Sequence, residues 1–209
     1  ANPLFEASFL NSRIRRAWRA APVAIGAIGQ ELGDLRYDYD YLGAGSDTLA
    51  EILDGKSKFA AKLKKAKKPM IILGQGAVTG VDGKAVLATA AKIASTYGAV
   101  SAEWNGFAVL HNAASRVGGL DIGFVPGVDN IDAASMATDA DVLFLLGADE
   151  LSLDKRKSGA TTIYMGTHGD VGAHHADIIL PASTYAEKSA TYVNTEGRAQ
   201  MTQRAAFAP

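Results

Sequence analysis

The stretch 70-MIILGQGAVTGVDGKAVLATAAKIASTYG-98 contains an apolar run, a glycine-rich turn and a helical pattern, in that order. Residues 70–73 are continuously apolar, as in a buried strand. After the turn, Val86, Ala90, Ile93 and Tyr97 recur at the spacing that places side chains on one face of a helix. The stretch therefore predicts a strand followed by a helix, which is the repeating unit of α/β proteins.

Further short apolar runs lie on both sides of this unit, at residues 23–28, 142–146, 161–165 and 178–180. They are continuous rather than alternating, which is typical of parallel strands covered on both faces. Helical stretches separate several of them. We therefore predict an α/β fold with a mostly parallel, doubly wound, Rossmann-like sheet and helices on both faces.

The composition of the 209 residues narrows the possible classes of protein. The hydrophobic fraction of 48% and charged fraction of 21% are those of an ordinary globular protein. The absence of cysteine excludes disulfides, thiolate zinc sites and cysteine-ligated iron–sulfur clusters within these residues. A net charge of −1 argues against a general nucleic-acid binder. The longest apolar run, residues 20–29, is too short to span a bilayer.

Two segments bear on how the chain is organised. The dipeptide Asn2-Pro3 is typical of a turn, and such turns usually join two secondary-structure elements. A helical pattern that includes Phe5 and Phe9 follows it directly. We therefore expect a strand before residue 1 and interpret residues 1–209 as a fragment of one domain, with a possible sub-boundary near 55–69. Residues 98–132 are rich in glycine and small side chains, and only 112–117 give a brief helical pattern.

Three predicted strands end on a glycine that is followed by polar residues: Gly74, Gly147 and Gly166. Ligands of open parallel sheets bind at the carboxyl ends of the strands, where glycine allows close approach of the backbone. Glycine also simply ends strands in turns, so both interpretations stay open.

Known catalytic and cofactor patterns are weak. Residues 74–80 resemble a dinucleotide fingerprint, but Gly80 comes one position late and no suitably placed acid follows, which favours a plain turn. His168, His174 and His175 lie near Asp170 and Asp177, yet they form neither a helical i, i+4 histidine pair nor a closed ligand set, so we predict no metal site. No G-x-S-x-G elbow supports a hydrolase.

Residues 56–68 are rich in lysine, while Phe59, Leu63 and Ala66 keep an apolar stripe. This pattern predicts an amphipathic helix with a solvated basic face. The face is a candidate docking surface for an acidic partner.

The most specific motif lies near the end of the chain. Pro181, the segment 185-YAEK-188 and the segment 192-YVNTEGRAQ-200 resemble the signature of the molybdopterin oxidoreductase superfamily. They resemble more narrowly the family of the largest iron–sulfur subunit of NADH-quinone oxidoreductase (respiratory complex I). Segments 2–7, 68–70, 145–149 and 168–173 are similar to that family too, as are Asn11 and residues 13–15.

The resemblance implies a pocket that has lost its cofactor. In molybdenum enzymes of the superfamily this region helps to hold a pterin dinucleotide, whereas the complex I subunit keeps the fold without molybdenum. The candidate residues of the vestigial pocket are Gly74, Gly147, Asn194, Arg198 and Gln200. The chain departs from the family patterns at two positions. Ala190 replaces a glycine usual in molybdenum enzymes, and Leu4 replaces an arginine usual in the complex I subunit.

The function implied by the resemblance is that of a structural and docking domain, with no catalytic residue and no cofactor in this fragment. The whole complex would carry electrons from NADH to quinone, with 4Fe-4S and 2Fe-2S clusters in an upstream region absent from this chain. The implied partners are other subunits of the peripheral arm, without nucleic acid and without membrane insertion. The implied location is the cytoplasmic side of the bacterial inner membrane or the matrix side of the mitochondrial inner membrane.

Two other functions remain as alternatives: an active molybdopterin-dependent oxidoreductase such as a formate dehydrogenase, and a free-standing nucleotide-binding module. If the pocket is vestigial, a buried Arg198 needs a carboxylate, and Glu187 and Glu196 are nearest in sequence. We therefore predict an ion pair there, and expect Asn194 and Thr195 to bind backbone groups.

Overall fold

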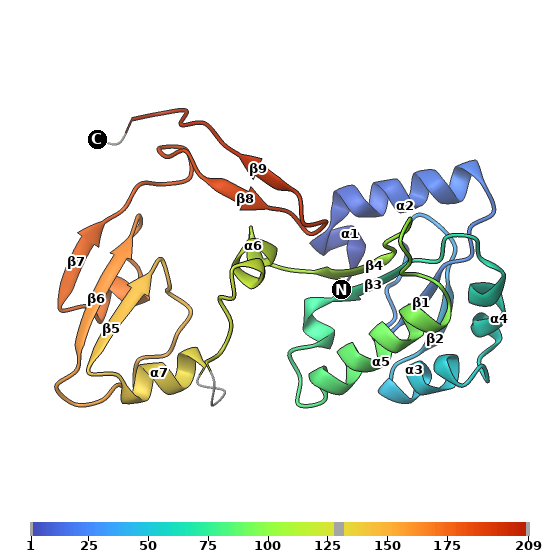
Figure 1. Ribbon diagram of the computed structural model, residues 1–209, viewed down its shortest axis with the longest axis horizontal. Coiled ribbons are helices and arrows are strands. Elements are labelled where there is room, and N and C mark those ends of the chain that lie inside the picture. The colour runs from blue at the N-terminus through green and yellow to red at the C-terminus, as the bar shows by residue number, and fades with distance from the viewer. Residues whose placement is uncertain (1, 128–131, 208–209) are drawn as a thin grey trace. The chain divides into compact units, whose positions relative to one another are not determined.

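The computed structural model describes residues 2–127 and 132–207 (Figure 1). The chain forms two compact units, Ala1–Asn112 and Ala113–Pro209. The range 55–69, where composition suggests a boundary, lies inside the first unit.

The first unit begins with two helices, α1 (Pro3–Glu6) and α2 (Ser8–Ala20). The Asn2 side chain accepts a hydrogen bond from the Leu4 N–H and so caps α1. Asn11 is the buried residue of α2; its amide donates to the Leu35 carbonyl, and its Oδ1 accepts from the Tyr37 hydroxyl at 2.8 Å. These bonds satisfy a polar group inside the fold and fix α2 on the connection that follows β1.

Strands β1 (Gly26–Ile28) and β2 (Asp40–Gly43) pair in parallel and are followed by helices α3 (Ser46–Leu53) and α4 (Lys58–Lys65). The Ser57 hydroxyl accepts from the Phe59 N–H, which starts α4 at its expected cap.

Strand β3 (Ile71–Gly74) leads through a short 3₁₀ turn, η1 (Gln75–Ala77), into helix α5 (Gly83–Thr96). A Cβ at Gly83 would lie 2.1 Å from the Val78 carbonyl oxygen, so the start of this helix requires glycine. Leu73, Val86 and Ala90 form a buried cluster between the strand and the helix. The strand-turn-helix prediction for residues 70–98 is confirmed.

Strand β4 (Phe107–Leu110) pairs in parallel with β3, with Ile71 opposite Phe107. It lies in the segment 98–132, to which sequence reasoning assigned no strand. The sequence predicts the brief helical pattern at residues 112–117, whereas the helix of this segment, α6 (Arg116–Asp121), begins only at Arg116 and lies in the second unit. Residues 128–131 of the segment lie outside the described residues.

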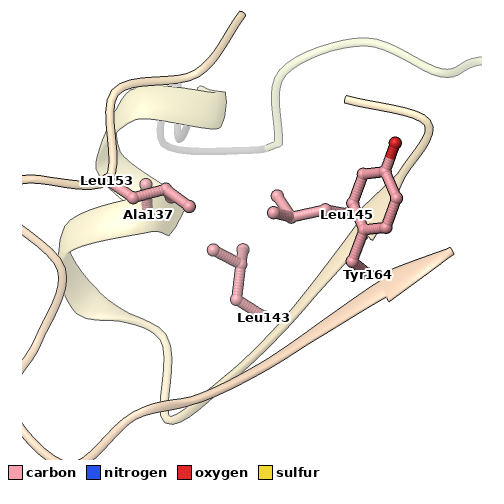
Figure 2. Close-up of a cluster of buried hydrophobic side chains, with 5 residues drawn as sticks. All are labelled: Ala137, Leu143, Leu145, Leu153 and Tyr164. Atoms are coloured by element: carbon pink, nitrogen blue, oxygen red, sulfur yellow. The ribbon is translucent and has the colours of Figure 1, made fainter. Parts of the chain in front are cut away.

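The second unit contains a three-stranded parallel sheet in the order β5-β6-β7, made of β5 (Val142–Leu146), β6 (Thr161–Gly166) and β7 (Ile178–Pro181). Helix α7 (Ala133–Asp139) precedes the sheet and the short helix α8 (Val171–His174) joins β6 to β7. Figure 2 shows the core, in which Leu143, Leu145 and Tyr164 from the sheet pack with Ala137 and Leu153.

The unit ends in an antiparallel hairpin of β8 (Thr191–Val193) and β9 (Ala199–Met201). The predicted α/β class and the parallel pairing are confirmed. The parallel strands are distributed over three small sheets in the described residues, two in the first unit and one in the second.

Candidate functional site

The carboxyl ends of the strands in the second unit border a cavity of about 780 Å³. Gly147 follows β5 and Gly166 ends β6, and both line the cavity together with His168 and Lys188. Gly147 has a positive φ of 63°, which a residue without a Cβ adopts at no steric cost. This is the position at which open parallel sheets bind ligands.

The candidate residues of the vestigial pocket do not all line this cavity. Gly147 does, whereas Asn194, Arg198 and Gln200 belong to the β8–β9 hairpin and are not among its lining residues. Gly74 lies in the first unit, where Gln75 accepts a hydrogen bond from the Asn112 N–H at 2.8 Å.

The polar motif at residues 194–198 forms a tight loop whose own backbone uses the Asn194 side chain. The Oδ1 of Asn194 accepts from the N–H groups of Glu196 at 3.0 Å and of Arg198 at 2.9 Å. The N–H of Gly197, which has a φ of 79°, donates to the Asn194 carbonyl. The prediction that Asn194 binds backbone groups is confirmed. The same prediction is wrong for Thr195, whose exposed side chain makes no hydrogen bond within residues 2–127 and 132–207.

The predicted ion pair of Arg198 is wrong. Arg198 is exposed, and in residues 2–127 and 132–207 no salt bridge joins it to Glu187 or Glu196. Glu187 accepts instead from the Thr184 N–H at 2.9 Å. The prediction assumed a buried guanidinium, and an exposed one keeps its hydration and needs no carboxylate.

The β8–β9 hairpin also contacts the residue that precedes α6. The Ser115 hydroxyl accepts from the Val193 N–H at 3.0 Å, although the two residues are far apart in sequence. Ser115 has a φ of 58°, in the left-handed region that non-glycine residues adopt rarely. Sequence reasoning gave no signal for this contact.

Asp149 organises the loops beside the cavity. Its carboxylate accepts from the Tyr164 hydroxyl at 3.1 Å and from the Gly172 N–H at 2.9 Å, which joins the end of β5 to β6 and α8. Burial raises the pKa of Tyr164, and the nearby carboxylates of Asp149 and Asp170 raise it further.

Arg156 makes a comparable connection at the opposite ends of the strands. Its guanidinium donates to the Thr162 hydroxyl at 2.6 Å and to the His175 carbonyl at 3.0 Å, and lies 3.5 Å from the Asp177 carboxylate. Thr162 is fully buried, so this network satisfies a polar group within the fold.

The histidines near these loops bind backbone carbonyls or a neighbouring hydroxyl. The Nδ1 atoms of His174 and His175 lie 2.9 Å from the Asp170 and Val171 carbonyl oxygens, and that of His168 lies 2.9 Å from the Thr167 hydroxyl. Over the described ranges, no group of three or more histidine or carboxylate side chains is placed to hold a metal ion.

One face of the three-stranded sheet is apolar and exposed. Leu143 and Leu145 of β5 point into the core, but the alternate residues Val142, Phe144 and Leu146 are 54%, 56% and 70% exposed. The apolar residues of β7, Ile178, Ile179 and Leu180, are exposed as well. The expectation that these strands are covered on both faces is wrong for residues 132–207.

The first unit carries the predicted basic helix. Lys62 of α4 forms an ion pair with Asp40, whereas Lys58, Lys64 and Lys65 are exposed; Ala60 is buried. The amphipathic pattern is confirmed for Phe59 and Leu63, which are half-buried, and is wrong for Ala66, which follows the end of α4 and is exposed. No helix in the part of the chain that the structure describes is long and apolar enough to cross a membrane.

Comparison with known proteins agrees with the motif near the end of the chain. The chain is 42% identical over its full length to the NADH-ubiquinone oxidoreductase 78 kDa subunit of Candida albicans. It is 44% identical over 205 residues to a subunit of the NADH-quinone oxidoreductase of Rickettsia bellii, and 40% identical over 201 residues to an NADH dehydrogenase iron-sulfur protein 1 of Solanum tuberosum.

The chain spans 28%, 29% and 26% of the lengths of these three relatives. The predicted resemblance to the large iron–sulfur subunits of complex I is confirmed at about 40% identity. A family model described as molybdopterin oxidoreductase matches residues 1–209. The chain therefore belongs to the molybdopterin oxidoreductase family.

Proposed function

We propose that the chain is a structural and docking region of a peripheral-arm subunit of NADH:quinone oxidoreductase, with a pocket that no longer binds a pterin cofactor. Its similarity over nearly its whole length to subunits of that enzyme supports this proposal. The chain itself carries no step of the reaction. Electron transfer from NADH to quinone belongs to the whole complex, with the 4Fe-4S and 2Fe-2S clusters in other parts of the subunit.

The observation that carries the proposal is the use of the Asn194 side chain. Its Oδ1 accepts two backbone hydrogen bonds from its own loop, at 3.0 and 2.9 Å. A ligand that took both acceptor positions of this oxygen would have to replace both hydrogen bonds and leave two N–H groups without a partner. Glu187 is engaged in the same way by the Thr184 N–H. The motif therefore supports the architecture of the hairpin.

The residues present do not fit a pterin dinucleotide held as the motif implies. Asn194 is engaged by its own loop, and neither Arg198 nor Gln200 lines the cavity at the carboxyl ends of the strands. We derive no chemical step through such a cofactor.

Two surfaces support a docking role. The apolar face formed by Val142, Phe144 and Leu146 is of the kind that proteins cover with another polypeptide. The exposed lysines of α4 provide a basic surface for an acidic partner. Partners on these surfaces would be other parts of the complex, on the cytoplasmic side of a bacterial inner membrane or the matrix side of a mitochondrial one.

The alternative is an active molybdopterin-dependent oxidoreductase such as a formate dehydrogenase. The cavity of about 780 Å³ beside Gly147 and Gly166 is the observation in its favour, because its volume lies in the range of ligand pockets.

The metal and pterin content of the intact subunit, purified from its native source, distinguishes the two functions. We expect iron by mass spectrometry but molybdenum and pterin far below one per polypeptide, with the pterin measured as its fluorescent oxidation product. A molybdenum enzyme purified by the same procedure is the control. Pterin near one equivalent would contradict the proposal.

A further inference from the structure

Asn105 is the one asparagine of the sequence that a glycine follows. Such a pair can deamidate without an enzyme. The backbone nitrogen of the glycine gives up its proton and bonds to the asparagine Cγ, and the side-chain nitrogen leaves with that proton as ammonia. Water then opens the resulting succinimide ring to aspartate, or to isoaspartate, in which the main chain continues through the side-chain carboxyl. Glycine favours the reaction because it has no Cβ to crowd the attacking nitrogen.

The fold holds the nucleophile of this reaction by hydrogen bonds on both sides of Gly106. Its N–H donates to the Ala99 carbonyl at 2.6 Å, and its carbonyl accepts from the Ile71 N–H at 2.7 Å. The peptide group is planar, so the lone pair of the deprotonated nitrogen lies where the proton was. In the fold that direction faces the Ala99 oxygen and not the Asn105 Cγ. The reaction therefore requires the bond between Gly106 and Ale99 to open.

The surroundings of the pair prevent it from rearranging in place. Gly106 is buried, and a Cβ there would lie 2.3 Å from the Pro69 carbonyl oxygen. The Trp104 Nε1–H donates to the same carbonyl at 2.9 Å. The Asn105 Oδ1 accepts from the Phe107 N–H at 3.2 Å, which holds the side-chain amide in a turn at the start of β4.

Residues 99–106 form a loop between α5 and β4, here called the 99–106 loop. The Ser101 N–H donates to the Trp104 carbonyl at 2.8 Å, and the Trp104 N–H donates to the Ser101 hydroxyl at 3.1 Å. The side chains of Ser101, Glu103 and Asn105 are exposed. A loop with exposed side chains and local hydrogen bonds opens at a lower free energy than the strands and helices that it joins.

We propose that Asn105 is a site of spontaneous deamidation that is closed in the folded unit and reacts when the 99–106 loop opens. Isoaspartate at this position lengthens the main chain by a methylene group directly before Gly106. The pairing of β3 with β4 begins at the next residue, where Ile71 lies opposite Phe107. The product is therefore out of register and does not close again, which makes each opening that reacts irreversible. The site is independent of the proposed function, because it rests on hydrogen bonds of the first unit alone.

The first test compares the full-length subunit in its native state and in denaturant at the same mildly alkaline pH. Peptide mass spectrometry measures deamidation of Asn105, and chromatography separates isoaspartate from aspartate. We expect the reaction to be about ten-fold or more slower in the native subunit, because the loop must open first. Equal rates in the two states would overturn the proposal.

Asn194 is the internal control of this test, because the β-branched Thr195 follows it. The branched side chain crowds the attacking nitrogen, so in denaturant Asn194 should deamidate more slowly than Asn105. A rate at Asn105 no higher than that at Asn194 would contradict the assignment of Asn105 as the reactive site.

Two variants test whether the opening is that of the loop. Trp104→Phe removes the hydrogen bond from the loop to the Pro69 carbonyl, and Tyr97→Phe removes a comparable bond to the Ile52 carbonyl outside the loop. Native deamidation of Asn105 should accelerate about three-fold or more in Trp104→Phe, because the lost bond no longer opposes the opening. In Tyr97→Phe it should stay within about two-fold of the parent. Equal acceleration in both variants, or none in either, would contradict the proposal.

Hydrogen exchange on the unaltered full-length subunit covers the case in which Trp104→Phe does not fold. The Gly106 amide exchanges through the same opening that permits deamidation of Asn105. Low concentrations of denaturant should therefore accelerate the two reactions by the same factor. Deamidation at an unchanged rate while Gly106 exchange accelerates would reveal a route that does not need the opening, and would overturn the proposal.

Discussion

At the scale of single residues, polar side chains of the second unit are held by nearby backbone. Asn194 and Glu187 accept hydrogen bonds from backbone N–H groups of their own loops, and Asp149 accepts one from the Gly172 N–H of α8. Such bonds fix loops at modest energetic gain, because each replaces a bond to water. The residues of the family motif are therefore expected to affect stability when they are replaced.

Replacing Asn194 with alanine tests this expectation. The change removes the acceptor of two loop N–H groups and should reduce the free energy of unfolding by about 1 kcal/mol, as for the loss of a helix N-cap. Chemical denaturation measures the effect. Thr195→Ala, at the exposed neighbouring position, is the control and should stay within about 0.5 kcal/mol of the parent. Equal effects of the two changes would contradict a special role for Asn194.

The Tyr164 hydroxyl gives a pH dependence. Burial raises the pKa of Tyr164 above its usual value of 10.0, so the phenolate forms more easily in the unfolded chain. The stability from this group is therefore complete below about pH 10 and is lost as the pH rises through the higher folded value.

Tyr164→Phe should weaken the alkaline loss of stability, measured by denaturation between about pH 9 and 11. Tyr185→Phe, at a ring that is 80% exposed, is the matched control and should leave the profile unchanged. A Tyr164→Phe profile that coincides with the parent profile would show that the hydroxyl has the same pKa in both states.

At the scale of elements, strand β5 shows that a continuous apolar run can form a strand with only one buried face. Its residues alternate between a buried and an exposed face although all five are apolar. The buried face packs against α7 and the loop at Leu153, whereas the other face has no cover within residues 132–207.

A pair of substitutions on this strand separates the two faces. Leu145→Ala should destabilise the chain by about 2–5 kcal/mol, because it leaves a cavity in the core of Figure 2. Phe144→Ala, one residue away on the exposed face, should change the stability by less than about 0.5 kcal/mol in the isolated chain. In the assembled complex we expect Phe144→Ala to weaken subunit retention during purification. A large loss of stability in the isolated chain for both would mean that both faces are covered there.

At the scale of the whole molecule, each unit has an incomplete layer. The first has two parallel sheets with unpaired edges on β1 and β3, and the second has a parallel sheet with one exposed apolar face. Parallel sheets are normally buried on both faces, since crossover helices cover them. Both features leave apolar surface or strand edges of these units exposed within residues 2–127 and 132–207.

The sequence by itself determined the α/β class, the positions of the apolar strands and of α5, the amphipathic character of α4, and the family. Each of these depends on local periodicity or on a contiguous motif, which the order of residues records directly. The role of Asn194 in its loop was also accessible, because its hydrogen-bond partners lie within four positions.

Only the tertiary structure decided which strands pair, which face of β5 is exposed, and that Arg198 is exposed rather than buried beside a carboxylate. It alone revealed β4 and the bond between Ser115 and Val193. The physical reason is the same in each case: burial and long-range pairing depend on what the rest of the chain places beside a residue, and no local pattern contains that information.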